Sequence, residues 1–342
     1  MDAKITKNRL SRLLTYDWVK ILAVVIALIV GWTVLFNSTA TKIRPSQRFT
    51  VINYYANDYL SDDFSSLLNN AYGRDKVFSY ETLELGTPLD LNEYEVSTGS
   101  VSLLESRFAT ADGDIMFVPS TPYTGDMQGV NFERTFAENF LNRFYGNVYK
   151  LDDEIEKDGP SNRFFVKFAE YLNKFYEDGY ENKNSLNLAK VEENFRARIK
   201  AKNDKRFRSE ALIKAGLPAE IERIKKYRDA LEEFNSYLHL GVITIETMTI
   251  KDDKGSALWT GKTAINLCPD ESKMDNLKKY LSYTIQEEYQ DDETGETLTR
   301  SKKTAKNMYA MILYHEKVET GYEFESVLFL NYLIKNSITI NA

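Results

Sequence analysis

Cysteine and histidine are nearly absent from this chain of 342 residues, which contains one cysteine and two histidines. A single cysteine cannot form an internal disulfide, so Cys268 is predicted to be a small buried apolar residue and not a nucleophile. His239 and His315 stand far apart, with no second ligand at metal spacing. This argues against a histidine metal site and a Ser-His-Asp triad, and it predicts both histidines at helix ends or on the surface.

The short motifs of common catalytic and nucleotide-binding sites are missing as well. No GxGxxG, GxxxxGK[ST] or GxSxG pattern occurs, so we predict neither a phosphate loop nor a nucleophile elbow, and no cofactor. The acidic turns at 252–253 and 291–293 lack the ligand spacing of a calcium loop. A pair of carboxylates for glycoside hydrolysis stays open, because their separation is spatial. We therefore expect a protein that is not an enzyme and has no metal site.

An excess of positive charge is lacking outside the N-terminus. The net charge is −7, and the first twenty residues hold five basic and two acidic side chains, so the remainder carries −10. This balance argues against nucleic acid as a partner. Basic residues do gather between Arg196 and Arg208. We predict a solvated helix face there, and the alternative is a surface for anionic headgroups or wall polymers.

One long apolar run is present, at 21–36, and it contains no charged residue. With Trp18 and Val19 it approaches the roughly 20 residues that a helix needs to cross a membrane, and it is apolar on every face, unlike most core helices. Five basic residues precede it and three follow closely, which predicts a cytoplasmic N-terminus and an extracytoplasmic remainder. We expect a single-pass signal anchor in the cell membrane. Cleavage after Ala40 is the alternative, and a lipoprotein anchor is excluded because no cysteine follows the run.

The remainder, of about 300 residues, is long enough for one large domain or two lobes. The predicted division places a cytoplasmic tail at 1–18, the transmembrane helix at 19–36, a linker at 37–48, α/β binding segments at 49–131 and 241–300, a helical lobe at 132–240 and C-terminal helices at 301–342.

The first α/β segment alternates strand, helix, strand, helix, strand. The predicted strands cover 49–55, 77–85 and 115–118, with helices beginning near Asp62 and Ser100. Helices between successive strands predict a parallel sheet with right-handed crossovers. The last strand is apolar throughout, so it is predicted to be buried on both faces.

Helical spacing of aromatic residues dominates the middle of the chain. We interpret these stripes as helix packing and not as a cofactor site. The predicted helices lie around 136–144 and 164–175, at 188–215 up to Gly216 and Pro218, and at 219–238. Further on, the sequence predicts strands at 241–250 and 259–267, a short helix at 269–282, a hairpin around 283–300, and helices at 303–318 and 323–335.

Residues 104–118, LESRFATADGDIMFV, combine a helix, a small-residue turn with Gly-Asp and a short apolar strand. Together with a first strand that leads to Asn57 and Asp58, this pattern resembles the first lobe of bacterial extracellular solute-binding proteins, a type II periplasmic-binding-protein-like fold. The resemblance covers residues 49–119, with a less specific similarity at 262–267 and 274–282. The retained membrane helix and the helical middle region depart from that family.

The resemblance implies two α/β lobes with a ligand held in the cleft between them, at the carboxyl ends of the strands. Open parallel sheets predict the same location. The ligand-binding residues implied in this sequence are Tyr55, Asn57, Asp58, Ser120, Thr121 and Tyr123, with Trp259 as a stacking residue.

These observations lead us to expect a membrane-tethered, non-catalytic protein that captures or senses a small polar solute, such as a sugar, beside an ABC-type permease. The main alternative is an envelope scaffold or assembly protein with a degenerate binding-protein fold that binds a partner protein. A cell-surface glycan hydrolase with paired carboxylates is the third candidate.

Overall fold

The chain separates into two compact units, Met1–Ile43 and Arg44–Ala342. The computed structural model describes residues 18–39, 47–54, 60–80, 82–91, 98–123, 134–151, 163–202, 204–251, 256–290, 296–316 and 321–338. The predicted boundaries near 131, 240 and 300 all fall inside the second unit, so the segments on either side of them belong to one compact body.

The first unit contains the helix α2, Trp18–Thr39. Its segment Trp18–Phe36 is long and apolar enough to cross a membrane, and the side chains of that segment are exposed. The prediction of an N-terminal helix of membrane-spanning length is therefore confirmed.

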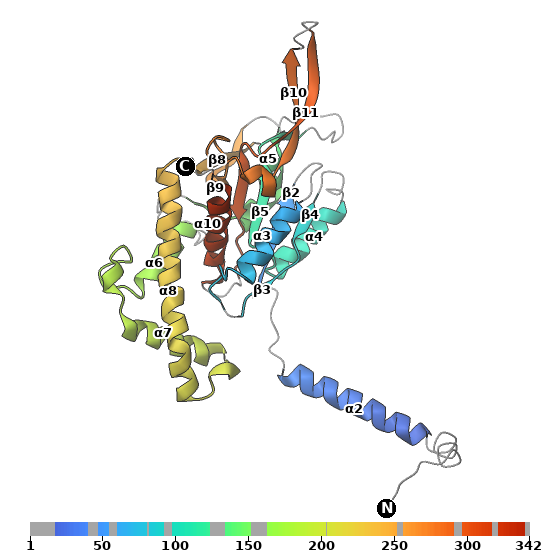
Figure 1. Cartoon of the computed structure of the whole chain (residues 1–342), viewed down its shortest axis with the longest axis vertical. Coiled ribbons are helices and arrows are strands. Elements are labelled where there is room, and N and C mark those ends of the chain that lie inside the picture. Colours follow the sequence, from blue (N-terminus) through green and yellow to red (C-terminus); the bar gives the residue numbers. More distant parts are fainter. Residues whose placement is uncertain are drawn as a thin grey trace, which may run out of the picture. The chain divides into compact units, whose positions relative to one another are not determined.

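The second unit combines helices with a six-stranded sheet (Figure 1). Its helices are α3 (Asp62–Tyr72), α4 (Thr98–Ala109), α5 (Phe136–Phe144), α6 (Phe164–Asn173), α7 (Leu188–Lys202), α8 (Glu210–His239), α9 (Leu277–Tyr280) and α10 (Glu325–Ser337). Its strands are β1 (Arg48–Phe49), β2 (Val51–Tyr54), β3 (Glu84–Leu85), β4 (Leu89–Leu91), β5 (Ile115–Pro119), β6 (Pro122–Tyr123), β7 (Arg134–Thr135), β8 (Thr244–Lys251), β9 (Ala257–Asn266), β10 (Tyr283–Gln290), β11 (Thr297–Thr304) and β12 (Met308–Ile312).

The large sheet has the strand order β4-β2-β5-β12-β9-β8. The strands β2 and β5 are parallel, as predicted, and β4, a strand that was not predicted, is parallel to β2; by contrast, β12, β9 and β8 each run antiparallel to their neighbours. The sheet is therefore mixed, and the predicted parallel sheet forms only the part made of β4, β2 and β5. The antiparallel part arises because a late strand, β12, inserts between β5 and β9.

Both faces of this sheet are covered. Val51 and Phe117 belong to a core shared with α3, α6, α8 and α10, whereas Ile52 and Met116 face a second core shared with α4 and α5. Successive strand residues point to opposite faces, which explains this division. The crossovers from β2 to β4 and from β4 to β5 thus use helices on opposite faces.

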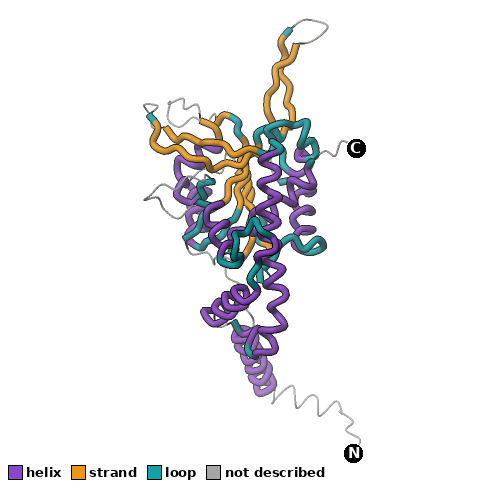
Figure 2. The backbone as a smooth tube through the Cα atoms, turned by 90° about the vertical axis from the view of Figure 1, so that its left-hand side faces the viewer, coloured by secondary structure: helices purple, strands orange, loops and turns teal. Residues whose placement is uncertain are grey.

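The hairpin β10–β11 is a separate two-stranded sheet. Both views show it projecting away from the six-stranded sheet (Figures 1 and 2). Most of its residues beyond Tyr283 are exposed or half-buried. The predicted hairpin around 283–300 is confirmed, although its turn lies outside the described residues.

The strand predicted at 77–85 is wrong over most of its length. Residues 76–80 form no strand, because the backbone N–H of Ser79 donates to the buried Glu325 at 2.9 Å and not to a neighbouring strand. Only β3 remains of it, and it pairs with β1. The strand that joins the large sheet is β4, which follows Gly86 and Pro88.

Two helix predictions are also wrong. The segment 303–318 forms the end of β11 and the buried strand β12 instead of a helix. The helix α8 begins at Glu210 and continues through Gly216 and Pro218, which were expected to end the preceding helix. Ser209 caps α8 by accepting a hydrogen bond from the N–H of Leu212 at 3.4 Å.

Candidate functional site

The strand order β4-β2-β5 is the kind of order that creates a crevice at one end of an open α/β sheet. The first crossover runs from β2 to β4, and the second runs from β4 past β2 to β5 on the opposite face of the sheet. In open α/β sheets, ligands bind where the strand order reverses in this way, outside the carboxyl ends of the strands. The residues that end these strands are Tyr54 in β2 and Pro119 in β5. We refer to the region around these two ends as the carboxyl edge.

Ser120 is the first residue after β5 and lies half-buried at this edge. Its N–H donates to the carbonyl of Asn307 at 3.2 Å, which ties it to the turn before β12. Its side chain lies close enough to the phenols of Tyr283 and Tyr309 to lower the pKa of each, against the larger effect of burial. Three hydroxyl groups from separate parts of the chain therefore converge at the carboxyl edge.

The two phenols are neutral at physiological pH. Burial raises the pKa of Tyr283 to about 12, and it also raises the pKa of Tyr309, where the carboxylates of Glu246 and Glu138 act in the same direction. Neutral hydroxyls can both donate and accept hydrogen bonds. The cluster of Ser120, Tyr283 and Tyr309, hereafter the hydroxyl cluster, is thus suited to uncharged polar groups.

Polar side chains also fix the neighbouring strand ends. Asn53, which is fully buried in β2, donates from Nδ2 to Oδ1 of Asp90 in β4 at 2.6 Å. The same oxygen accepts the N–H of Leu60 at 3.1 Å, just before Ser61 caps α3. Asp90 therefore holds the start of α3 against the carboxyl edge.

The amide pair Asn266 and Asn307 completes the edge beside the hydroxyl cluster. Nδ2 of Asn266 donates to Oδ1 of Asn307 at 2.9 Å, and the N–H of Asn307 donates to the carbonyl of Cys268 at 2.8 Å. Asn307 adopts a left-handed conformation with φ of 54°, which asparagine tolerates better than most residues. This turn delivers Tyr309 to β12 at the level of Val118.

The predicted site residues fall into three groups. Tyr55, Asn57 and Asp58 lie outside the described residues, directly after β2. Ser120, Thr121 and Tyr123 follow β5, where the carbonyl of Thr121 accepts the N–H of Phe136 at the start of α5 and Tyr123 pairs with Arg134 in β7. The structure thus keeps the second group at the carboxyl edge.

Trp259 does not join the other predicted residues. It lies near the start of β9, whereas Asn266 at the end of that strand is level with Val118, so Trp259 is roughly 20 Å further along the sheet. Its ring packs against Tyr145 with centroids 5.9 Å apart. The fold therefore separates Trp259 from Ser120, because β9 runs parallel to β5 and its first residues lie at the opposite edge.

Sequence reasoning missed Tyr283, Tyr309, Asn266 and Asn307. No sequence pattern marked these residues as part of a site. Tyr309 falls in the segment 303–318, which was predicted as a helix, and the two asparagines belong to no motif. Only the insertion of β12 between β5 and β9 brings them beside Ser120.

Groups suited to acid–base or metal chemistry lie elsewhere. In the described part of the chain, no group of three or more His, Cys, Asp or Glu residues could hold a metal ion. His315 is buried, contrary to the prediction, and its Nε2 contacts the carbonyl of Gly113 at 2.6 Å before β5 begins. Burial lowers the pKa of His315. His239 ends α8 and Cys268 is fully buried, as predicted.

No family model, curated protein or solved structure matches this chain.

Proposed function

We propose that the second unit is a non-catalytic binding domain that takes a small polar solute at the carboxyl edge and is held at the membrane by α2. The observation that carries this proposal is the strand order β4-β2-β5, in which the crossovers from β2 to β4 and from β4 to β5 lie on opposite faces of the sheet. Ligand sites of open α/β sheets occur at such points. This arrangement supports the proposed similarity to extracellular solute-binding proteins.

The chemistry of the hydroxyl cluster supports an uncharged, hydroxyl-rich solute such as a sugar. Neutral phenols and a serine hydroxyl exchange hydrogen bonds with other hydroxyls in either direction. Because burial keeps both phenols protonated, they would offer no negative charge to a cationic ligand. A membrane permease is the partner that we propose for a tethered domain of this kind.

The basic residues before α2 support a cytoplasmic N-terminus and an extracytoplasmic second unit. A tether of this kind would confine the binding domain to the membrane surface, where a permease could receive the solute.

A thermal-unfolding screen of the full chain in detergent tests the proposal with sugars, peptides and polyamines. A ligand at one hundred times its dissociation constant stabilises a folded protein by about 2.7 kcal/mol, which is easily measured. We expect a sugar to raise the unfolding midpoint with a saturable dose response. Folded protein that responds to none of these ligands would count decisively against a solute-binding role.

A pair of phenol variants locates the binding site. Tyr309→Phe removes one hydroxyl of the hydroxyl cluster and should weaken sugar binding about tenfold, since a lost hydrogen bond costs about 1 kcal/mol or more. Tyr145→Phe is the matched control, because Tyr145 is half-exposed and packs on the distant Trp259. Equal affinities for wild type and Tyr309→Phe would place the solute elsewhere.

The projecting hairpin supports a second candidate, an envelope scaffold that binds a partner protein. Among the described residues, β10 pairs only with β11, so the outer edge of each strand presents backbone groups that another strand could pair with. This candidate predicts that shortening the hairpin abolishes partner capture in cross-linking experiments. Solute binding at the carboxyl edge would be unaffected by that change.

A further inference from the structure

The helices α7 and α8 form an arm that carries the basic residues noted in the sequence. We define the arm as residues 188–219, which comprise α7, the short helix Lys205–Phe207 and the first part of α8. Its tip is the region around the short helix. Both views place this tip on the opposite side of the second unit from the hairpin β10–β11 (Figures 1 and 2).

The tip of the arm is positively charged within an acidic protein. From Arg196 to Lys214 the sequence holds eight basic and two acidic side chains, whereas the whole chain has a net charge of −7. Lys200, Lys205 and Arg208 are all exposed to solvent. Leu212 lies among them and is 47% exposed. The tip thus presents cations together with an apolar side chain.

The two carboxylates of this segment are held by arginines. Glu210 accepts a hydrogen bond from Nη1 of Arg196 at 2.8 Å, and Asp204 accepts one from Nη2 of Arg206 at 2.7 Å. The segment contains no third carboxylate. Its exposed lysines therefore face solvent as a basic surface, and surfaces of this kind are attracted to anionic lipid headgroups.

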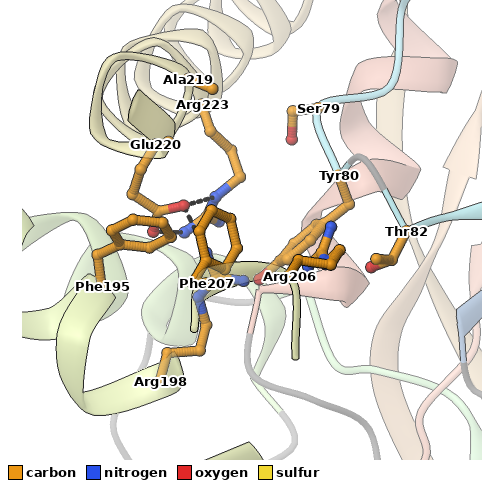
Figure 3. A pocket seen from close by; sticks show the side chains of 11 residues that line it. Ser79, Tyr80, Thr82, Phe195, Arg198, Arg206, Phe207, Ala219, Glu220 and Arg223 are labelled. Carbon is orange, nitrogen blue, oxygen red and sulfur yellow. Dashed lines mark hydrogen bonds and ion pairs between the residues drawn. The ribbon is translucent and has the colours of Figure 1, made fainter. Parts of the chain in front are cut away.

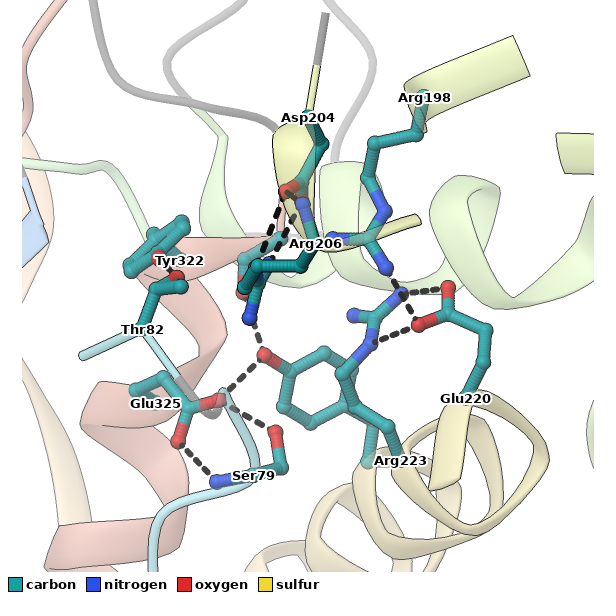
Figure 4. Close-up of polar contacts among 11 residues, drawn as sticks. Ser79, Thr82, Arg198, Asp204, Arg206, Glu220, Arg223, Tyr322 and Glu325 are labelled. Atoms are coloured by element: carbon teal, nitrogen blue, oxygen red, sulfur yellow. Dashed lines mark hydrogen bonds and ion pairs between the residues drawn. The ribbon is translucent and has the colours of Figure 1, made fainter. Parts of the chain in front are cut away.

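Buried contacts join the parts of the arm and hold it to the domain. Glu220 in α8 accepts a hydrogen bond from Arg198 in α7 at 2.6 Å and another from Arg223 at 3.1 Å (Figure 4). The rings of Phe195 and Phe207 pack edge to face beside this network, with centroids 5.0 Å apart (Figure 3). These contacts make α7, the short helix and α8 one packed element.

The chain that follows α2 reaches the second unit beside the base of this arm. Gln47 is the first described residue after α2, and its Nε2 donates to the hydroxyl of Tyr322 at 3.5 Å. The ring of Tyr322 stacks on that of Tyr80 with centroids 4.0 Å apart, and the guanidinium of Arg198 lies 5.7 Å from the ring centre of Tyr80. Two stacked rings therefore connect the entry of the chain to α7.

The segment between α2 and Gln47 is short. Residues 40–46 separate Gln47 from Thr39, the last residue of α2, and a chain of this length spans at most about 30 Å. An α2 that crosses the membrane thus keeps Gln47, and with it the base of the arm, within that distance of the bilayer. From Arg223 to Glu210 the helix α8 extends about 20 Å, so the tip can reach the headgroups.

From these observations we propose that the tip of the arm binds anionic headgroups of the membrane that holds α2. This inference rests on the tether of the proposed function and not on solute binding. Each basic residue beside an anionic bilayer strengthens binding by roughly fivefold, and Leu212 adds apolar contact at the headgroup level. Docking of the tip turns the hairpin side of the domain away from the bilayer. The carboxyl edge, which contains Tyr283 at the base of the hairpin, is then open to incoming solute.

Energy transfer in lipid nanodiscs tests this docking with the full chain. Ala211→Cys, at an exposed position near the start of α8, carries a fluorescent donor, and the lipid headgroups carry the acceptor. Cys268 is fully buried and should stay unlabelled. We expect strong transfer in discs that contain phosphatidylglycerol, and weak transfer in phosphatidylcholine alone or at about 0.5 M salt. Equal transfer in the two lipids would overturn the proposal.

A label on the hairpin is the control for position. Leu298→Cys lies on β11 at a site that is 38% exposed. Transfer from this position should be weak in both kinds of disc, because docking places the hairpin away from the bilayer. Stronger transfer from position 298 than from position 211 in anionic discs would contradict the proposed orientation.

Charge reversal assigns the effect to the tip. Lys205→Glu combined with Arg208→Glu changes two exposed cations and should lower the ratio of docked to undocked domain at least tenfold. The fold should persist, because Arg208 directly precedes Ser209, which caps α8, and negative charge is favoured there. Lys303→Glu combined with Lys335→Glu is the matched control at exposed positions of β11 and α10, and it should dock as wild type does. Equal losses in both double variants, or no loss in the first, would contradict the proposal.

Two further outcomes separate the docking from its alternatives. Soluble poly(glycerol phosphate) that displaces the arm from anionic discs, at a phosphate concentration equal to that of the lipid, would assign the arm to wall polymers and overturn the proposal. A chain that fails to enter the discs would overturn the tether of the proposed function and the docking with it. Entry into the discs without any dependence on phosphatidylglycerol would overturn the docking alone.

Discussion

Gly86 leaves no room for a side chain. A Cβ atom at this position would lie 2.1 Å from Oγ1 of Thr50, and that hydroxyl is held by its 2.8 Å hydrogen bond to Asp112. The Thr50 side chain thus cannot move aside without losing a buried contact. The glycine allows the chain to pass from β3 to β4 directly beside β1 and β2.

Gly86→Ala should therefore lower the free energy of unfolding by about 1 to 3 kcal/mol, as overpacking does in other cores. Chemical denaturation of the full chain measures this change. Gly146→Ala is the control, because no atom lies within 4 Å of the added Cβ, and it should shift stability by less than about 0.5 kcal/mol. Equal effects of the two substitutions would show that the contact with Thr50 is not decisive.

Asp114 predicts a pH dependence of stability. Desolvation of its carboxyl group raises its pKa to about 8, and the nearby carboxyls of Asp112, Glu325 and Glu323 add to the shift. An unfolded aspartate titrates near 4, so between these values the folded chain holds a proton that the unfolded chain has released. The free energy of unfolding should consequently fall as pH rises from about 4 to 8, by at most about 1.4 kcal/mol per pH unit from this residue.

Asp114→Asn removes this contribution and keeps an oxygen for the N–H of Thr50, which donates to Asp114 at 2.8 Å. The variant should show a shallower loss of stability between pH 5 and 8 than wild type. Denaturant unfolding across this range measures both slopes. Identical slopes would mean that Asp114 is already ionised in the folded protein.

Among the elements, the β10–β11 hairpin exposes most of its side chains to solvent and buries few of them. Its outer part, beyond the pair Gln286 and Ser301, contains no buried residue among those described. Isolated two-stranded hairpins are only marginally stable in water, so the domain cannot depend on this one for its core. Its length therefore points to a role outside folding.

Replacing residues 287–300 by an Asn-Gly turn should change the free energy of unfolding of the domain by less than about 1 kcal/mol. The Tyr283 hydroxyl would remain in place, since it lies at the base of the hairpin and donates to the carbonyl of Lys306. Denaturant unfolding of the shortened chain gives the answer. A loss of several kcal/mol would mean that the hairpin packs on the domain in solution.

Elements with clear local signals could be predicted from the sequence. The helix α3 has a capping serine, a stripe of buried Phe64, Leu67 and Leu68, and a terminating Gly73, and the prediction of 62–72 matches it. Strand β12 had no such signal. It is buried between two strands, so its residues show no alternation, and a short apolar run rich in Met and Ala cannot be told from a helix by spacing.

Tertiary contacts also overrode local preferences at two places. Ser79 lies in a segment with strand-like alternation, but Glu325 takes its backbone N–H. Pro218 lies inside α8, although proline usually ends a helix. The helix continues after it to His239, and this later part buries Tyr227 and Phe234 in the core. The partner of Ser79 is distant in the sequence, so no local pattern reports it.

The candidate site could be predicted in position but not in composition. The rule for open α/β sheets indicated the loop after β5, where Ser120 lies half-buried. The same rule could not indicate Tyr283 or Tyr309. Their position beside Ser120 depends on the antiparallel strand β12, and the sequence predicted a helix in that segment. Trp259 was included on residue type alone, and the direction of β9 removes it from the site.

For the molecule as a whole, the orientation in the membrane can be measured through its single cysteine. Cys268 is fully buried and its thiol has a pKa raised by burial to about 12, so it should react poorly with maleimides. Lys4→Cys lies before α2, and Leu298→Cys lies at a position that is 38% exposed on β11.

In intact bacterial cells, a membrane-impermeant maleimide should label the cysteine at position 298 and leave the one at position 4 unlabelled until the cells are lysed. The unmodified chain should remain unlabelled in both conditions. Labelling of position 4 in intact cells, with position 298 protected, would reverse the proposed topology.

Hydrogen–deuterium exchange of the full chain, with and without a sugar that stabilises it, tests the proposed binding site most directly. Binding should slow amide exchange at the carboxyl edge, in the segments around Tyr54, Ser120 and Asn307, and leave the hairpin β10–β11 and the segment around Trp259 unchanged. Slower exchange confined to those latter regions, or no change anywhere under saturating sugar, would contradict a solute site at the carboxyl edge.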